Sequence, residues 1–460
     1  MKKYKIEPGE VLEGSSSLYT NTRRVEKTDY QTKNMAKNKV ISYLMEKGKT
    51  RETVIKEQIE RYRKYRRDWK AQPKNCINNK WSVEELKENK VLPLCVDIET
   101  AAICDLACPF CSRQYIATPD KLIDSDLCYE MIDQASSLGV PSIKFNLRGE
   151  PLLHPELPEF ISYAKSKGIL ETGINTNATM LTEKKSRELI ESGLDLLIFS
   201  FDGGTKETYE KMRPGRFKEN KFEKVYNNIV RFSEIRKEMN SVFPFTKIQM
   251  IMTKETYFEK EKFFELFNSC VDDVTVSQYQ ERGGDLELAS ELFDNKKKDE
   301  LDGVYFHNGQ IRTRVDADEI VYRAIGRKPC EQLFQRLTVT YEGRVGMCCI
   351  DWGASHAVGY VHKLALINFS EYNRVLKRAQ KNKKGYELLP NLTIGGEFDV
   401  SEGQPILSLE EIWCGEEIQK VRESHYKNAL GEVEVCANCT YTDTFVWRKV
   451  KGQEVDDVMF

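Results

Sequence analysis

The chain has 460 residues, 40% of them hydrophobic, which is enough for two or three domains with sizeable cores. Its 70 basic and 72 acidic residues nearly cancel, which argues against a nucleic-acid coat protein and against a disordered acidic chain. The densest apolar run, 194–201, is too short to span a bilayer, and no apolar stretch follows the basic N-terminus, so we expect a cytoplasmic protein without a secretory signal.

Residues 1–90 are predicted to form a helical extension. Ile55, Ile59, Tyr62 and Trp69 recur at helical spacing among many basic residues, and no strand-like alternation is present. A basic aromatic stripe of this kind is either an RNA-binding surface or the apolar side of an amphipathic helix that docks on the main body. We favour docking, with the charges facing solvent.

Residues 91–285 alternate between short apolar runs and amphipathic stretches. This pattern predicts six strands separated by helices, hence βα units and a parallel sheet. A closed barrel of this kind has eight repeats, so six indicate an incomplete (β/α)6 TIM-type barrel. The predicted strands are 94–98, 142–147, 170–175, 194–201, 247–253 and 273–277, with helices at 125–138, 155–167, 182–192, 222–239 and 259–270.

A variable segment, 286–329, connects the barrel to a third region, 330–460. A hairpin is predicted around the Glu342-Gly343 turn, and a helix over 408–426 begins with a capping box of Ser408 and Glu411. Thirteen cysteines cannot all pair as disulfides, and in a reducing compartment clustered cysteines are more often metal ligands. We therefore expect 330–460 to be a small α+β domain that binds a metal centre.

Three cysteines follow the first predicted strand in the pattern C-x3-C-x2-C. Cys104, Cys108 and Cys111 lie where parallel folds place their sites, and their thiolates can converge on one metal centre. Three thiolates on a four-iron cluster leave one iron open for chemistry. Zinc held by three cysteines and a water is the competing interpretation.

The segment from Cys104 to Cys111, with Phe110 before its last cysteine, closely resembles the signature of the radical S-adenosylmethionine (radical SAM) superfamily. Four further motifs resemble the family's in the same order, over roughly residues 93–280. They are Gly149-Glu150-Pro151 (the GEP motif, which receives the methionyl amino group), Asn175-Thr176-Asn177 (the TNG segment, with Ala178 in place of its glycine), Ser200-Phe201-Asp202-Gly203 (the SLDG segment) and Tyr209 to Arg213 (whose arginine meets the SAM carboxylate).

This resemblance implies a [4Fe–4S] cluster on the three cysteines and SAM as a second cofactor. It also implies a 5′-deoxyadenosyl radical that takes a hydrogen atom from the substrate, and a one-electron reductant such as flavodoxin or ferredoxin. The residues that would contact SAM are Phe110, Gly149, Glu150, Pro151, Asn175, Ser200, Asp202 and Arg213.

A second cysteine set resembles the SPASM extension of radical SAM enzymes. Cys330 is followed by a glycine and then Cys348 at that extension's spacing, and Cys436 and Cys439 form its C-x2-C. The full pattern continues with three more cysteines, whereas no cysteine follows Cys439 here. The four present imply one auxiliary [4Fe–4S] cluster with full protein ligation. Cys349 in place of Cys348, and a structural zinc on the same four residues, are the alternatives.

The expected activity is oxidation (dehydrogenation) or epimerisation of a sugar, an aminocyclitol or a glycan precursor. The alternative is maturation of a ribosomally made peptide, and an outsider is a non-catalytic zinc-binding protein. Peptide-modifying relatives often carry an N-terminal module with a small sheet, so the lack of a strand pattern in 1–90 favours the small substrate. Candidate catalytic residues are Cys349, or else Cys95, as a hydrogen-atom donor, and Asp351 as a proton acceptor unless it only forms a turn.

Overall fold

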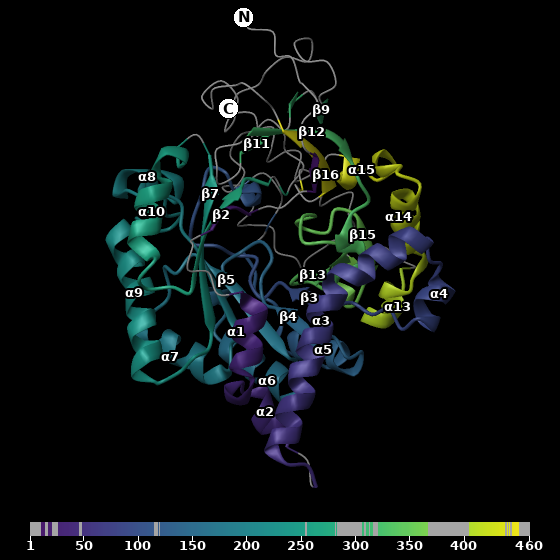
Figure 1. Cartoon of the computed structure of the whole chain (residues 1–460), viewed down its shortest axis with the longest axis horizontal. Coiled ribbons are helices and arrows are strands. Elements are labelled where there is room, and N and C mark those ends of the chain that lie inside the picture. The colour runs from purple at the N-terminus through teal and green to yellow at the C-terminus, as the bar shows by residue number, and fades with distance from the viewer. Residues whose placement is uncertain are drawn as a thin grey trace, which may run out of the picture.

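The computed structural model describes the chain from residue 11 to residue 449, with gaps. The gaps are 14–16, 21–25, 46–47, 115–117, 119, 254, 281, 283–305, 308–309, 312, 316–320, 367–403, 438, 440 and 442–443. A large sheet occupies the centre, helices lie to its left, to its right and below it, and a smaller sheet lies above it (Figure 1). Within these ranges every helix is too short or too polar to cross a membrane.

The central sheet has ten strands, and seven neighbouring strands in it run parallel. The six predicted strands correspond to β3 to β8, which confirms the βα pattern. The described sheet has two free edges, so the prediction of an incomplete barrel is also confirmed. From one edge to the other its strands are β15 (Ala357–Tyr360), β14 (Arg344–Gly346), β13 (Arg336–Val339), β3 (Cys95–Ile98), β4 (Ser142–Lys144), β5 (Glu171–Thr176), β6 (Leu196–Ser200), β7 (Phe245–Met252), β8 (Asp273–Gln278) and β2 (Ser17–Thr20).

The helices between the strands cover the outer face of the sheet. Their apolar sides pack on alternate strand residues such as Leu197 and Phe199, which are fully buried in the main core. The other residues of the same strand, Ile198 and Ser200, face the inside of the barrel and are only half-buried. These helices are α5 (Ser125–Ser137), α6 (Leu157–Ser166), α7 (Glu183–Ser192), α8 (Lys206–Met212), α9 (Phe222–Glu238) and α10 (Lys260–Phe267), with 3-10 turns η2 (Ser112–Gln114), η3 (Pro151–Leu153) and η4 (Tyr257–Glu259).

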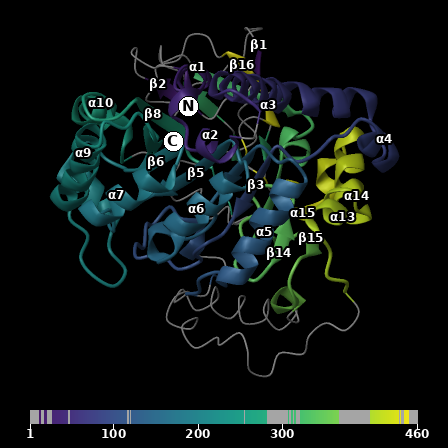
Figure 2. The same ribbon diagram turned by 90° about the horizontal axis from the view of Figure 1, so that it is seen from below.

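The N-terminal region is mainly helical, as predicted, and its long helix α3 (Arg51–Asn79) runs from α2 towards α13 and α14 (Figure 2). Tyr62 of α3 is fully buried and donates a hydrogen bond to Glu171 Oε2 at 2.6 Å, while Lys27 pairs with Glu171 Oε1 at 2.8 Å. The aromatic stripe therefore docks on the barrel, as the preferred interpretation had it. The other helical elements are α1 (Lys27–Lys33), η1 (Met35–Lys37), α2 (Val40–Tyr43) and α4 (Val83–Glu88).

Two short N-terminal strands were not predicted. β1 (Val11–Glu13) pairs with β16 (Phe445–Lys449) and β2 (Ser17–Thr20) pairs with β8, so the expectation that 1–90 contains no strand is wrong for these segments. Each has only three or four residues and is held by a partner far along the chain, which leaves too short a stretch for an alternating pattern.

The C-terminal region continues the barrel sheet through its predicted hairpin. β13 pairs in parallel with β3 and antiparallel with β14, so this hairpin directly extends the barrel. The remaining strands, helices and 3-10 turns of this region are β9 (Phe306–His307), β10 (Gln310–Ile311), β11 (Thr313–Val315), β12 (Val321–Arg327), η6 (Glu331–Phe334), η7 (Lys363–Leu366), α13 (Leu409–Trp413), α14 (Glu416–Tyr426), η8 (Leu430–Glu432) and α15 (Glu434–Ala437). Of the strands, β11, β12 and β16 form a four-stranded sheet with β1, while β9 and β10 form a separate pair.

The helix predicted over 408–426 is two helices, α13 and α14. Its capping box is present, because Ser408 accepts from the Glu411 N–H and the Glu411 side chain accepts from the Ser408 N–H. The break comes at Gly415, which has an extended backbone and sits so close to α13 that an added Cβ would lie 2.8 Å from the Glu411 carbonyl oxygen. A single glycine in an amphipathic pattern does not show this break in the sequence.

Candidate active site

The three cysteines of the C-x3-C-x2-C motif lie in the loop that follows β3. Cys108 is buried, and Cys104 and Cys111 are half-buried. The Ala107 N–H donates to the Pro214 carbonyl at 2.9 Å, which ties the loop to the end of α8. The three thiols share one apolar cluster with Leu106, Phe110, Met212, Ile251 and Tyr279.

Gly149 brings the end of β4 against the start of the cysteine loop. A Cβ at this position would lie 2.3 Å from the carbonyl oxygens of both Ala101 and Ile103. The next residue, Glu150, donates its N–H to the Ile103 carbonyl at 2.9 Å. Glycine is required here because the backbone of the Gly149-Glu150-Pro151 motif touches the segment that delivers Cys104.

Substituting Gly149 by alanine is expected to displace the cysteine loop. A methyl group at 2.3 Å from two carbonyl oxygens forces the backbone of 101–103 to move, and Cys104 moves with it. We expect the variant to lose about four irons per chain, measured on anaerobically purified protein. Gly431→Ala is the matched control, because nothing lies within 4 Å of its added Cβ. Equal iron in both variants would show that the contact at Gly149 does not matter.

Glu150 joins the ends of β4 and β5. Its Oε1 accepts from Thr176 Oγ1 at 2.7 Å, and its Oε2 accepts from the Asn177 N–H at 2.7 Å. Burial, together with the nearby charge of Asp105, raises the pKa of Glu150 to about 7. The carboxyl group therefore lies just after β4 and fixes the start of the loop after β5.

Asn177 and Asp105 connect that loop to the cysteines. Asn177 Nδ2 donates to Asp105 Oδ1 at 2.8 Å and lies 3.9 Å from Cys104 Sγ. Thr179 donates to the other oxygen of Asp105. Neither Asn177 nor Asp105 was among the predicted site residues, although both stand inside the motifs that the sequence showed.

Two asparagines at the carboxyl ends of neighbouring strands have unsatisfied acceptors. The side-chain oxygens of Asn175, near the end of β5, and of Asn146, just after β4, are buried and have no hydrogen-bond partner among the described residues. A buried carbonyl oxygen without a donor is costly unless a ligand or water supplies one. Asn175 is a predicted cofactor contact and Asn146 is an addition from the structure.

Asp202 and Arg213, both predicted cofactor contacts, are paired with each other. Arg213 Nε donates to Asp202 Oδ2 at 2.8 Å, and Asp202 Oδ1 accepts from the Ile251 N–H at 2.6 Å. The guanidinium carbon lies 5.7 Å from the centre of the Phe110 ring. Through Phe110, this buried pair contacts the cysteine loop. Ser200, also predicted, is the half-buried last residue of β6, and Pro151 begins η3.

Three thiols thus stand at the carboxyl edge of a parallel sheet, beside the ends of β4, β5 and β6, which carry the expected polar residues. Residues 98–267 match the family model described as the Radical SAM superfamily. This segment is a radical SAM domain.

Among curated proteins, the chain is similar to the tungsten-containing aldehyde ferredoxin oxidoreductase cofactor-modifying protein of Pyrococcus furiosus. The identity is 29% over 188 residues, covering 39% of this chain and 50% of that protein. It is 30% identical over 125 residues to the GTP 3′,8-cyclase of Chlorobaculum tepidum, covering 27% and 38% respectively. The matches therefore span half or less of these relatives. Among solved structures, BtrN in complex with AdoMet and 2-DOIA aligns with 16% identity and a TM-score of 0.41, covering 80% of this chain and 99% of that one.

A [4Fe–4S] cluster fits the three cysteines of the loop 104–111 (the radical SAM loop), and SAM fits the strand ends beside it. Burial raises the pKa of the Cys104 thiol to about 12 and raises those of Cys108 and Cys111, so a bound metal centre is what would stabilise all three as thiolates. Three thiolates hold three irons and leave the fourth for SAM. The unpartnered oxygens of Asn175 and Asn146 match the N–H and O–H donors that SAM carries.

The second cysteine set, which lies outside the radical SAM domain, comes together around one small cavity. Cys330, Cys348, Cys436 and Cys439 all line it, from η6, the end of β14 and α15. Burial raises the pKa of the Cys330, Cys348 and Cys436 thiols. In the described part of the chain no three His, Cys, Asp or Glu side chains are grouped as ligands of one metal ion, at this cavity or at the first cysteine set.

The two candidate catalytic residues lie beside this cavity. Cys349 is not among its lining residues, and its thiol faces Gln332 Oε1 at 3.7 Å, which favours Cys348 as the ligand. Asp351 lines the cavity but uses both oxygens locally, accepting from Ser355 N at 2.9 Å and from His356 N at 3.0 Å. That arrangement matches the turn-forming alternative for Asp351.

Arg282 links the two cysteine-bearing loops. Its N–H donates to the Ser112 Oγ at 3.1 Å, next to Cys111, and its Nη1 donates to the Cys349 carbonyl at 3.0 Å. Its guanidinium carbon also lies 5.3 Å from the centre of the Trp352 ring. Sequence analysis missed this residue because it lies outside every motif.

Arg148 and Glu99 form a buried ion pair between the barrel and the C-terminal hairpin. Arg148 Nε donates to Glu99 Oε1 at 2.6 Å, and Glu99 Oε2 accepts from the Tyr341 N–H at 3.1 Å. Neither side chain is more than 1% exposed. Because Arg148 directly precedes Gly149, the pair fixes the radical SAM motif relative to β13 and β14.

Replacing Arg148 by methionine is expected to lower the free energy of unfolding by about 3–5 kcal/mol, since it leaves the Glu99 charge buried without its partner. Urea denaturation of the iron-free protein measures the change. Arg231→Met is the control, because Arg231 forms its ion pairs with glutamates on the surface, and the midpoint should shift far less. Similar shifts in both variants would contradict a special role for the buried pair.

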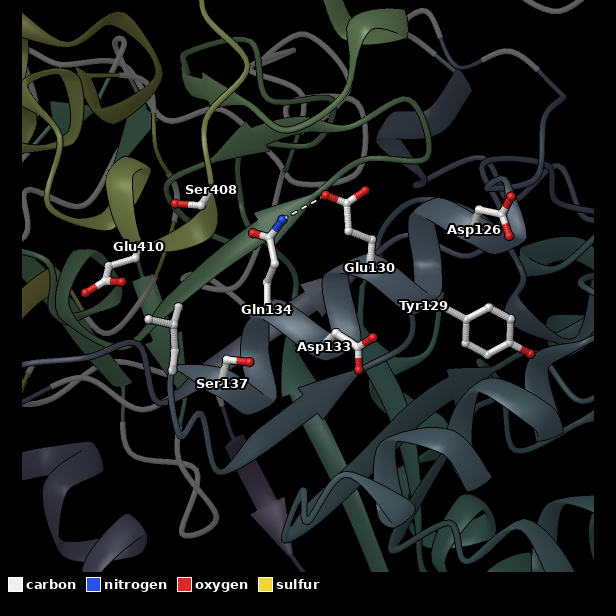
Figure 3. A pocket seen from close by; sticks show the side chains of 9 residues that line it. Asp126, Tyr129, Glu130, Asp133, Gln134, Ser137, Ser408 and Glu410 are labelled. Atoms are coloured by element: carbon white, nitrogen blue, oxygen red, sulfur yellow. Dashed lines mark hydrogen bonds between the residues drawn. The ribbon is translucent and has the colours of Figure 1, made fainter.

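A hollow of about 590 Å³ lies elsewhere, on the outer side of α5 (Figure 3). Asp126, Glu130 and Asp133 line it, and Gln134 donates to Glu130 Oε1 at 3.0 Å. The opposite side of α5 is buried in the core, so this acidic hollow lies outside the barrel. None of the predicted site residues lines it.

Proposed function

We propose that this radical SAM enzyme uses one auxiliary [4Fe–4S] cluster and oxidises or epimerises a carbinol carbon of a small hydroxylated substrate. A sugar, an aminocyclitol or a glycan precursor belongs to this class. The observation that carries the proposal is the cavity shared by Cys330, Cys348, Cys436 and Cys439. A zinc site on the same residues would leave unexplained why this cavity is connected through Arg282 to the radical SAM loop.

The inner face of the barrel supports a polar substrate. On β6 and β7 its residues alternate with core residues and are half-buried, and polar residues are among them. Lys144 of β4 is a further one, and among the described residues its side chain makes no hydrogen bond or ion pair, while its backbone pairs with β3 and β5. Hydroxyl groups suit such a surface because they supply both donors and acceptors. The strand residues concerned are Lys144, Asn146, Asn175, Ser200, Lys247 and Gln249.

When bound, the first cluster and SAM together would supply hydrogen-atom abstraction, and the auxiliary cluster would supply one-electron transfer. The chain's own residues bind and orient. Asn175 and Asn146 present acceptors to the cofactor, and Lys144 presents donors to the substrate. Cys349 would return a hydrogen atom in an epimerisation. Asp351 would accept a proton in an oxidation, but its local hydrogen bonds make Cys349 the better-placed residue.

The substrate class is tested by SAM cleavage. Anaerobic, reduced protein is incubated with SAM and with either a panel of polyols, aminocyclitols and sugar nucleotides or a panel of synthetic peptides. We expect 5′-deoxyadenosine to increase with a member of the first panel alone. An increase with peptides alone would support the maturase alternative, and zinc in place of iron would overturn the enzymatic proposal.

A further inference from the structure

His425 of α14 is a buried histidine that lines the cavity of Cys330, Cys348, Cys436 and Cys439 (the auxiliary cavity). Both of its ring nitrogens contact cysteine residues there. The Cys330 N–H donates to Nδ1 at 3.0 Å. Since a backbone N–H can only donate, Nδ1 carries no proton, and the neutral ring has its proton on Nε2. Nε2 lies 3.4 Å from Cys436 Sγ. The ring therefore presents an N–H to the sulfur of one cysteine and accepts from the backbone of another.

This geometry is set by the fold around the ring. His425 is 1% exposed, on the side of α14 that faces the cavity. It lies 95 residues from Cys330 and 11 from Cys436 along the chain, so this one side chain links two cysteine-bearing segments. A second N–H···S contact is present beside it, from the Tyr441 backbone to Cys439 Sγ at 3.3 Å. His425 differs in being a side chain, which a substitution can remove.

We propose that His425 is a positioning residue whose Nε2–H donates to the Cys436 sulfur and raises the reduction potential of the auxiliary cluster. This inference rests on the proposed ligation of that cluster by the four cysteines. Reduction adds one electron, and part of the added negative charge resides on the sulfurs. A hydrogen-bond donor aimed at a sulfur stabilises the reduced form more than the oxidised form, so the potential rises.

The test uses the full chain with Cys104, Cys108 and Cys111 replaced by alanine, so that only the auxiliary cluster remains. His425→Phe keeps a ring of similar size and removes both nitrogens. His425→Gln places an amide N–H where Nε2 lies but restores no acceptor for the Cys330 N–H. The comparison of the two variants therefore isolates the donor. Midpoint potentials are measured by redox titration followed by electron paramagnetic resonance.

We expect His425→Phe to keep its iron and to shift the equilibrium about tenfold towards the oxidised cluster, which is about 59 mV for one electron. His425→Gln should recover most of that shift. His154→Phe is the matched control: His154 is also buried, accepts the Glu156 N–H on Nδ1 at 3.2 Å and faces the Ile123 carbonyl at 3.2 Å with Nε2. Its potential should equal that of the parent.

Three results would overturn the inference. The first is an unchanged potential in His425→Phe with full iron. The second is loss of iron in both His425 variants, which would make His425 a ligand. The third is the nitrogen coupling measured on protein that keeps His425 and carries ¹⁵N-labelled histidine. The proposed hydrogen bond gives weak coupling to the cluster. Strong coupling would show that His425 is a ligand, and no coupling would show that it makes no contact. If the parent itself holds no iron, the proposed auxiliary cluster fails as well, so the two failures are distinguishable.

Discussion

Replacing Cys104, Cys108 and Cys111 together by alanine is expected to lower the iron content from about eight to about four per chain and to abolish SAM cleavage. The three thiols share one apolar cluster in one loop, so replacing them removes all the protein ligands of one iron–sulfur cluster. The four cysteines around the second cavity belong to other segments and keep their places. SAM cleavage disappears because the iron with the open position is lost. Iron and sulfide analysis and the yield of 5′-deoxyadenosine measure both effects.

The matched control replaces three other buried or half-buried cysteines, Cys76, Cys128 and Cys270, by alanine. They lie on or next to helices, outside both sites, and act as small hydrophobic side chains. This control should retain about eight irons and its SAM cleavage. Continued production of 5′-deoxyadenosine by the Cys104/Cys108/Cys111 variant would show that the radical SAM site has been misassigned. A fall from about four irons to none would leave the auxiliary cavity without a cluster.

The barrel was predictable from the sequence because its signals are local. Each strand from β3 to β8 carries a short apolar run, and the intervening helices have apolar faces. Some of these helices also have a start signal, such as Thr182, whose side chain accepts from the Lys185 N–H. Parallel strands require crossovers, so the order of elements fixed the sheet type. Such information lies within a few residues of each element.

Features that depend on distant pairing were not predictable in this way. Nothing in Arg336–Val339 distinguishes a hairpin in a separate domain from one that pairs in parallel with β3, some 240 residues earlier. β1 and β2 are too short for a pattern and exist because β16 and β8 offer free edges. In both cases tertiary contacts decide the structure.

In the candidate site, too, the local features were predictable and the contacts between distant residues were not. Cysteine spacing indicated both metal-binding sets, because ligands to one centre cluster along the chain. The partners of those cysteines do not: Asn177 reaches Asp105 from 72 residues away, and Arg282 reaches Ser112 from 170 residues away. The pairing of Asp202 with Arg213 shows a further limit, since motif identity placed both residues at the site without showing that they bind each other.

Replacing Cys436 and Cys439 together by alanine is expected to remove about four irons while leaving some SAM cleavage. Both thiols line the auxiliary cavity, and two remaining cysteines cannot hold a four-iron cluster there. The radical SAM loop is connected to this region through Arg282, which contacts the Cys349 carbonyl, so cleavage should weaken without disappearing.

The chain offers a sharp control for this prediction in its adjacent cysteines. Cys348 lines the cavity, whereas the Cys349 thiol faces Gln332. Cys348→Ala should therefore lose iron as the Cys436/Cys439 variant does, and Cys349→Ala should keep about eight irons. Unchanged iron in the Cys436/Cys439 variant would refute the auxiliary cluster. If instead Cys349→Ala loses iron and Cys348→Ala keeps it, the cluster stands but Cys349 is its ligand. The hydrogen-atom donor would then be a different residue. Cys95 on β3 is the next candidate, because its side chain lies on the same face of the sheet as Asp97.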